Sequence, residues 1–176
     1  VEVRCFGLVR IRKIGSLFVL AEWTRGGTKH RITAGPYWHL GLVTASVILF
    51  VTLVIYLYVL SGRLVVRVVG LCLGFTAFVF LLLTSLVAPG IAPRHLVPMG
   101  KDWTFSEYAQ AYRPPGTVYC RISHVFIAKY HHFCPWSGTA IGETNLTYFH
   151  ALIASLSVSF SYNLIILILF LARDGQ

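Results

Sequence analysis

The sequence predicts an all-α integral membrane protein with three transmembrane helices and an irregular loop region between the second and the third. Two observations carry this prediction. Apolar residues make up 56% of the 176 residues, and charged residues only 12%, which is about half the charged fraction of a typical soluble chain. The apolar residues are also gathered into long uncharged runs, each long enough for a helix to cross a bilayer.

Residues 1–38 are basic and precede the first apolar run. They contain seven Lys and Arg residues against two Glu residues. Leu8–Leu20 mixes apolar and basic side chains, which is typical of an amphipathic segment lying at a membrane surface. We therefore expect residues 1–38 to form a basic interfacial segment.

Residues 39–87 are expected to form a transmembrane hairpin. Gly41–Leu60 is uncharged and has the length of one span, and Val68–Val87 gives a second. Ser61–Arg63 breaks the apolar pattern between them. Two consecutive spans return the chain to the side on which it started, so both flanks of the hairpin share one side of the membrane.

The distribution of Lys and Arg predicts which side that is. The two flanks carry seven and five Lys or Arg residues, whereas the hairpin turn has only Arg63 and Arg67. The positive-inside rule places the flanks on the cytoplasmic side, or on the equivalent inner side of an organelle. We expect the basic residues to face anionic lipids. Nucleic acid is not expected as a partner, because no surface that alternates aromatic and basic residues is visible.

Residues 88–147 form the one sizeable polar region, and residues 148–172 the third span. The polar region is rich in Pro, Gly and aromatic residues and shows no sustained period, so it cannot bury much apolar core alone. Metal ions, membrane contact or a partner must support it. The third span contains Asn163, for which we expect one of three arrangements: facing a partner helix, bonding backbone or facing the lumen. Its serines suit helix packing in lipid, and residues 173–176 form a tail.

Lys129–Asn145, with the sequence KYHHFCPWSGTAIGETN, contains the candidate catalytic residues. Cys134 follows His132 by two residues and precedes Pro135 and Trp136. This arrangement puts a thiol nucleophile beside an imidazole base on a stiff, non-helical segment. Asn145 is expected to cap the third span or to bond nearby backbone.

This stretch resembles the core of the DHHC-type protein S-acyltransferases, or palmitoyltransferases, whose pattern is D-H-H-C-P-W-x-x-N-C-[IV]-G-x-x-N. The match covers Cys134-Pro135-Trp136, Ile141-Gly142 and Asn145. Ala88-Pro89-Gly90 is similar to the family's D-P-G motif, with Ala88 in place of Asp. RPPGTVYC, which begins at Arg113, is similar to the R-P-P-R-x-x-H-C segment. With the basic lead-in TRGGTKHRITAGPYW, the resemblance runs from about residue 25 to residue 172.

The resemblance implies a mechanism in which an acyl group passes from acyl-CoA to the motif Cys and then to a protein thiol. Cys134 falls on the nucleophile and His132 on its base. His131 falls where the family has an Asp that orients the base, and an imidazole cannot supply that fixed negative charge. Three basic residues are candidates to contact the phosphates of CoA or lipid headgroups: Arg113, Arg121 and Lys129.

The resemblance also implies two zinc ions, each held by three Cys and one His. The corresponding positions are Ser106, Ala109, Tyr119 and Phe126 for the first ion, and Cys120, Ser123, Phe133 and Ala140 for the second. A structural zinc needs four N or S ligands, so we expect both ions to be absent and no metal to be bound. A new Cys₂His₂ site is an alternative; its ligands are Cys120, His124, one of His131 and His132, and Cys134.

Two functions from different classes follow. The favoured one is a pseudoenzyme, retained as an accessory or structural subunit of a larger membrane complex and needing no cofactor. The other is an active, zinc-independent S-palmitoyltransferase that uses acyl-CoA through Cys134. The first is favoured because nine family positions have changed, namely the orienting Asp (His131), the D-P-G Asp (Ala88) and seven zinc ligands. Resemblance suggests a secretory-pathway membrane, and a subunit role suits an organelle inner membrane, such as the mitochondrial one, equally well.

Overall fold

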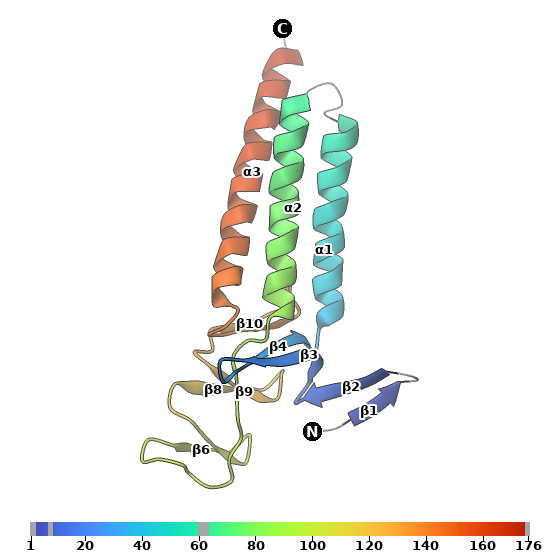
Figure 1. Cartoon of the computed structure of the whole chain (residues 1–176). Helices are drawn as coiled ribbons and strands as arrows, with labels where there is room; N and C mark the ends of the chain where they lie inside the picture. Colours follow the sequence, from blue (N-terminus) through green and yellow to red (C-terminus); the bar gives the residue numbers. More distant parts are fainter. Residues whose placement is uncertain (1–2, 7–8, 60–63, 175–176) are drawn as a thin grey trace.

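The architecture differs from the all-α prediction, because short β-strands accompany three long helices. The computed structural model describes residues 3–6, 9–59 and 64–174. Within these ranges it contains three α-helices and eleven β-strands in four sheets. Figure 1 shows the helices side by side, with the strands gathered beyond one end of them. The fold is an α-helical membrane part joined to a β-rich part, so the all-α fold class is wrong.

The three helices are long and apolar enough to cross a membrane. They are α1 (Trp38–Leu53), which continues into the π-helical segment η1 (Val54–Val59), α2 (Leu64–Leu86) and α3 (Leu146–Asp174). The candidate spans are Trp38–Leu57, Leu64–Leu86 and Leu146–Ala172, each of which overlaps one of the apolar runs. The predicted break at Ser61–Arg63, the predicted first-span end at Leu60 and residues 175–176 of the tail lie outside the described residues.

Glycines in α2 allow α1 and η1 to approach it closely. A Cβ atom added to Gly70 would lie 2.0 Å from the ring of Tyr56. One added to Gly74 would lie 2.4 Å from the side chain of Thr52. Close approach at small residues is a common way for helices to associate in lipid, where no hydrophobic driving force acts between them.

Asn163 joins α3 to η1. The Tyr56 hydroxyl donates a hydrogen bond to the side-chain oxygen of Asn163 at 2.6 Å. The Asn163 amide donates to the backbone carbonyl of Ser159, one turn earlier, at 2.7 Å. Two of the three predicted arrangements, contact with another helix and bonding to backbone, are therefore present together.

The basic N-terminal region is a sheet. Its strands β1 (Val3–Phe6), β2 (Val9–Ile14), β3 (Leu17–Arg25) and β4 (Thr28–Ala34) form an antiparallel meander in that order. In β2, Val9–Arg12 alternates apolar and basic residues, which is the two-residue period of a strand, and Lys13 then breaks the alternation. A mixture of apolar and basic residues is typical of both a membrane-surface segment and a solvent-exposed strand, so the pattern alone does not distinguish the predicted interfacial segment from the observed sheet.

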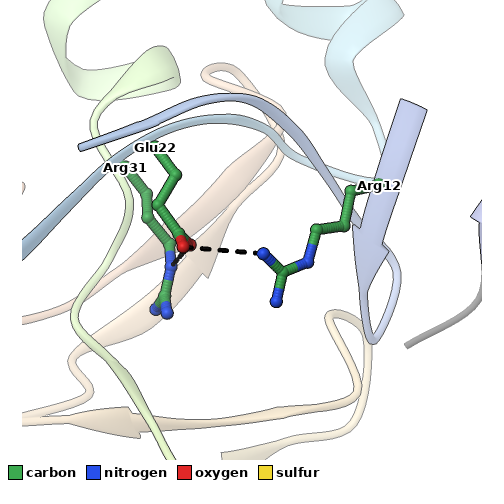
Figure 2. A network of polar contacts seen from close by, with 3 residues as sticks. All are labelled: Arg12, Glu22 and Arg31. Atoms are coloured by element: carbon green, nitrogen blue, oxygen red, sulfur yellow. Dashed lines mark hydrogen bonds and ion pairs between the residues drawn. The ribbon is translucent and has the colours of Figure 1, made fainter. Parts of the chain in front are cut away.

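Two arginines converge on one carboxylate across this sheet (Figure 2). Arg31 of β4 contacts the Glu22 carboxylate at 2.5 Å, and Arg12 of β2 lies 3.5 Å from its other oxygen. The hydrogen bond from Arg31 and the positive charges of Arg31, Arg12 and Lys29 hold the pKa of Glu22 below its usual value. Glu22 thus stays ionised at neutral pH and ties β2, β3 and β4 together.

The polar region between α2 and α3 is built from very short strands. They are β5 (Ile91–Ala92), β6 (Thr104–Ser106), β7 (Ala111–Arg113), β8 (Thr117–Cys120), β9 (Val125–Ala128), β10 (His132–Cys134) and β11 (Thr139–Ile141). They form a three-stranded sheet in the order β5-β9-β8 and two hairpins, β6-β7 and β10-β11. Strands of two to four residues are too short to show a period, so the sequence pattern did not reveal them.

Leu17, at the start of β3, connects the N-terminal sheet to this region. Its side chain is fully buried in one cluster with Cys120, Val125, Ile127 and Ala140 from β8, β9 and β11. Next to it, the backbone N–H of Ser16 donates to the carbonyl of Ser123 at 2.8 Å. The support that the polar region needs thus comes partly from the chain's own N-terminal sheet.

Candidate functional site

The candidate catalytic residues lie on the β10–β11 hairpin. In this hairpin His132 pairs with Ile141, Phe133 with Ala140 and Cys134 with Thr139. Successive side chains of a strand point to opposite faces, so His132 and Cys134 share one face and Phe133 lies on the other. Figure 1 places this hairpin directly at the ends of α2 and α3, where the helices meet the β-rich part.

The Cys-Pro-Trp segment forms the turn of the hairpin. The N–H of Gly138 donates to the carbonyl of Pro135 at 3.0 Å, and the Ser137 hydroxyl donates to the carbonyl of Cys134 at 3.3 Å. Cys134 is buried with 6% of its surface exposed, whereas the neighbouring Trp136 is 73% exposed. The turn thus presents an indole to its surroundings while the thiol is covered.

Asn145 holds the hairpin against the helices. Its side-chain oxygen accepts a hydrogen bond from the N–H of Gly142 at 2.9 Å. Its amide donates to the carbonyl of Ala140 at 2.9 Å and to that of Thr84 in α2 at 3.1 Å. Because Asn145 is fully buried, these three bonds fix the register between β11, α2 and the start of α3. The prediction that Asn145 bonds backbone at this point is confirmed.

His131 and His132 contact each other through their Nδ1 atoms, which are 2.7 Å apart. Burial, and then the neighbouring His131, lower the pKa of His132 below its ordinary value. The ring of His132 also packs against Phe149 of α3, with 5.0 Å between the ring centroids. His132 is thus held between an imidazole and a phenyl ring, with no carboxylate at the Nδ1 contact that the structure gives it.

The Nδ1 contact restricts what His132 can do. One Nδ1 must carry the proton and the other must accept it. If His132 donates, its Nε2 lone pair is free to accept a proton from a thiol. If His131 donates, both nitrogens of neutral His132 are occupied, one as acceptor and one as N–H. Only the first arrangement leaves His132 as a general base.

The positions that correspond to the second family zinc site lie within or beside the Leu17 cluster. Cys120 and Ala140 are buried members of it, and Phe133 packs against it. Ser123 is fully buried nearby, and Tyr130 also packs against the cluster. Burial, and then the adjacent Cys120 thiol, raise the pKa of Tyr130. Apolar side chains and a tyrosine thus occupy this part of the fold.

The positions that correspond to the first family zinc site are also packed by aromatic side chains. Tyr119 and Phe126 face each other across β8 and β9, with ring centroids 5.4 Å apart. Ser106 ends β6, and Ala109 lies in the turn that leads to β7. Arg94 lies over the Tyr119 ring, 5.7 Å from its centroid.

The alternative Cys₂His₂ site gains no support. Within residues 3–6, 9–59 and 64–174, no three His, Cys, Asp or Glu side chains are placed to hold a metal ion together. Cys120 lies in the apolar cluster, against which Tyr130 packs. The Nδ1 atom of His124 is hydrogen-bonded to the Tyr119 hydroxyl, 3.3 Å away. Two of the candidate ligands, Cys120 and His124, therefore have other neighbours in this structure.

Each of the three basic residues predicted to contact phosphates has a partner within the chain. Arg113 bonds the Thr104 hydroxyl at 2.7 Å and the Thr117 carbonyl at 2.8 Å. Arg121 lies over the Tyr108 ring at 3.7 Å, and Lys129 pairs with Glu143 at 2.6 Å. A different set of basic residues, from the N-terminal strands and residue 94, lines a common cleft. Of the basic residues of β2, only Lys13 is among them, and the sequence alone gives no signal for this cleft.

The fold and the hairpin together define a membrane protein whose helix ends carry a Cys-Pro-Trp turn on a small β-rich region. The family model for the DHHC palmitoyltransferases matches residues 100–176. Over these residues the chain is similar to the DHHC palmitoyltransferase family, in agreement with the resemblance of its motifs.

Curated relatives carry the same family description. Palmitoyltransferase ZDHHC18-A of Danio rerio is 27% identical over 168 residues, covering 77% of this chain and 36% of the relative. Probable protein S-acyltransferase 1 of Arabidopsis thaliana is 27% identical over 115 residues, covering 46% and 34%. Palmitoyltransferase ZDHHC18 of Homo sapiens is 39% identical over 46 residues, covering 26% and 12%. The chain thus matches about a third or less of the length of these relatives.

Proposed function

We propose that this chain is a non-catalytic member of its family, serving as an accessory or structural subunit that packs against lipid and partner helices in a larger membrane complex. The observation that carries the proposal is the contact between His131 and His132, 2.7 Å apart at Nδ1. It replaces the carboxylate–imidazole pair that the family resemblance implies with two imidazoles.

This replacement matters because the base becomes positively charged when it takes the thiol proton. A carboxylate at Nδ1 stabilises the imidazolium, whereas a second imidazole adds no negative charge. His131 instead acts with burial to lower the pKa of His132. The ion pair of imidazolium and Cys134 thiolate is therefore disfavoured, and so is attack of Cys134 on an acyl thioester.

The helices support a structural role. In the most apolar 18-residue stretch of the third candidate span, Leu146–Ala172, only 6% of the residues are buried within this chain. The exposed side chains of α3 include Ile153, Phe160, Ile165 and Leu169. Lipid or other helices must cover this face in a membrane. A subunit that contributes α3 to a complex would use it in this way.

An active, zinc-independent protein S-palmitoyltransferase is the second candidate, and one observation favours it. His132 and Cys134 share a strand face, and the lowered pKa keeps His132 unprotonated at neutral pH, as a general base must be. In that case acyl-CoA would donate its acyl group to the Cys134 sulfur and leave as the CoA thiol. The group would then pass to a substrate thiol.

Acylation of the protein itself tests both candidates. Purified full chain is incubated with a long-chain acyl-CoA and searched by mass spectrometry for a hydroxylamine-labile adduct, with Cys134→Ala as the control. We expect no adduct on Cys134 in protein shown to be folded by circular dichroism and a cooperative melt. A thioester on Cys134 that is absent from Cys134→Ala would refute the non-catalytic role and establish the second candidate's first step.

A further inference from the structure

We propose that a cleft between the N-terminal sheet and the polar region binds a ligand that carries clustered phosphate groups. The cleft has a volume of about 1070 Å³. Its basic lining residues are Lys13 from β2, Lys29 and Arg31 from β4, and Arg94 after β5, with His124 beside them. We call this space the basic cleft. It does not include Cys134, so it is separate from the candidate catalytic hairpin.

Most of the positive charge in the basic cleft is not neutralised. Within the described part of the chain, no ion pair joins Lys13, Lys29 or Arg94 to a carboxylate. No Asp or Glu is among the residues that line the cleft. Like charges held near one another are unfavourable unless an anion joins them, so the cleft is suited to an anionic ligand.

The cationic groups are held in place by other contacts. The guanidinium of Arg94 donates to the carbonyl of His124 at 3.2 Å and to the Tyr119 hydroxyl at 3.4 Å. The ammonium of Lys13 lies 4.2 Å from the centre of the Phe18 ring. Neither contact removes charge, so each restricts the side chain while leaving its positive charge available to a ligand.

Arg31 is positioned by the network in Figure 2. The Nε–H of Arg31 donates to one carboxylate oxygen of Glu22 at 2.5 Å, and the guanidinium of Arg12 lies 3.5 Å from the other oxygen. One carboxylate therefore serves two guanidinium groups and leaves a net positive charge. A fork of N–H donors on a guanidinium matches phosphate oxygens, and Arg31 keeps donors that the Nε bond to Glu22 does not use.

The walls of the basic cleft are fixed relative to one another. Gly15 has φ of +60°, and a Cβ atom added there would lie 2.4 Å from the carbonyl of Ser123. Next to it, the backbone N–H of Ser16 donates a hydrogen bond to the same carbonyl of Ser123 at 2.8 Å. The two sides of the cleft are thus in direct backbone contact, and the basic groups of both are preorganised.

Phosphate is the anion that this arrangement suits best. Arginine and lysine side chains together suit phosphate monoesters as ligands. A small molecule that carries several phosphate groups would contact the basic residues on both sides of the cleft. The volume is at the upper end of that of small-molecule sites. The same groups occur on a phosphoinositide headgroup in the bilayer and on a soluble inositol phosphate. The position of Ile91 and Arg94 soon after the end of α2 leaves the cleft near the membrane.

Binding to two probes tests the proposal on the full chain in detergent micelles. The probes are soluble inositol 1,4,5-trisphosphate and short-chain phosphatidylinositol 4,5-bisphosphate, measured by calorimetry. Lys29→Glu should weaken binding roughly tenfold or more, because a charge-assisted bond becomes a repulsion. The matched control is Lys101→Glu, an equal charge reversal at an exposed residue outside the cleft. It should change the Kd less than about twofold, as expected for a screened surface charge.

The outcomes distinguish a membrane phosphoinositide from a soluble inositol phosphate, and two results would contradict the proposal. Tighter binding of the lipid than of its free headgroup assigns the site to the membrane, and equal binding assigns it to the phosphates alone. No saturable binding of either probe would overturn the proposal, as would equal weakening by Lys29→Glu and Lys101→Glu. If Lys29→Glu does not fold, Lys29→Gln replaces it and should weaken binding several-fold. The acylation experiment has no bearing on any of these results.

Discussion

At His132, two influences lower the pKa of the imidazole below its ordinary value of 6.5, namely burial and the neighbouring His131. The folded state therefore favours the neutral ring more than the unfolded state does. Well above pH 6.5 this residue is neutral in both states, and its contribution to stability is fully present. As the pH falls towards the folded pKa, the unfolded state binds the proton first, and stability is lost.

Substituting His131→Asp should reverse this effect. A carboxylate next to Nδ1 stabilises the imidazolium, so we expect the pKa of His132 to rise by roughly one unit or more. Titration of the His132 ring by NMR in micelles measures it. His131→Asn is the matched control, because it keeps the shape of Asp without the charge. Equal pKa values in the two variants would show that charge at residue 131 does not govern His132.

At the scale of elements, Asn145 decides how the β10–β11 hairpin sits on the helices. Asn145→Ala leaves the N–H of Gly142 and the carbonyls of Ala140 and Thr84 without these partners. We expect a loss of roughly 3 kcal/mol, because a buried unsatisfied group costs about 1–3 kcal/mol. For a chain of this size that lowers Tm by about 6–12 °C in a thermal melt in detergent.

Thr147→Ala is the control for Asn145→Ala. Thr147 is exposed one residue into α3, and in the described ranges its hydroxyl makes no hydrogen bond to another group. Its Tm should move by no more than about 2 °C. If Asn145→Ala and Thr147→Ala have the same Tm, the three hydrogen bonds of Asn145 do not hold the hairpin.

The elements show what the sequence was able to predict. Long uncharged runs are unambiguous in lipid, so all three helices and the packing role of Asn163 were predictable. The strands β5 to β11 are too short for a period, and β8, β9 and β11 pack on Leu17 of the N-terminal sheet, a contact that pattern alone does not reveal. The alternation from Val9 to Arg12 in β2 is visible in the sequence, but a mixture of apolar and basic residues is also typical of a membrane-surface segment, so it does not by itself identify a strand. At the hairpin, spacing predicts that His132 and Cys134 lie side by side, and the structure puts them on one face of β10; the contact between His131 and His132 was not predicted.

At the scale of the whole molecule, the N-terminal sheet is part of the core of the polar region. The sheet contributes Leu17, and the polar region contributes Cys120, Phe133 and Ala140, which fall on family zinc positions. This arrangement offers an explanation of how the region folds if no metal supports it. The packing energy of Leu17 would then do what metal binding does in zinc-dependent domains.

The substitution Leu17→Ala measures that contribution. Removing a fully buried leucine should cost about 2–5 kcal/mol, since it leaves a cavity among Cys120, Val125 and Ile127. Leu20→Ala, at a residue of the same strand that is 56% exposed, should cost far less. In parallel, wild-type protein is melted with and without EDTA. We expect Leu17→Ala to lower Tm strongly and EDTA to leave Tm unchanged, because apolar packing and not a metal would hold the region. A loss of Tm in EDTA that matches the effect of Leu17→Ala would instead show that a bound metal stabilises the fold, and would contradict the expectation that no metal is bound.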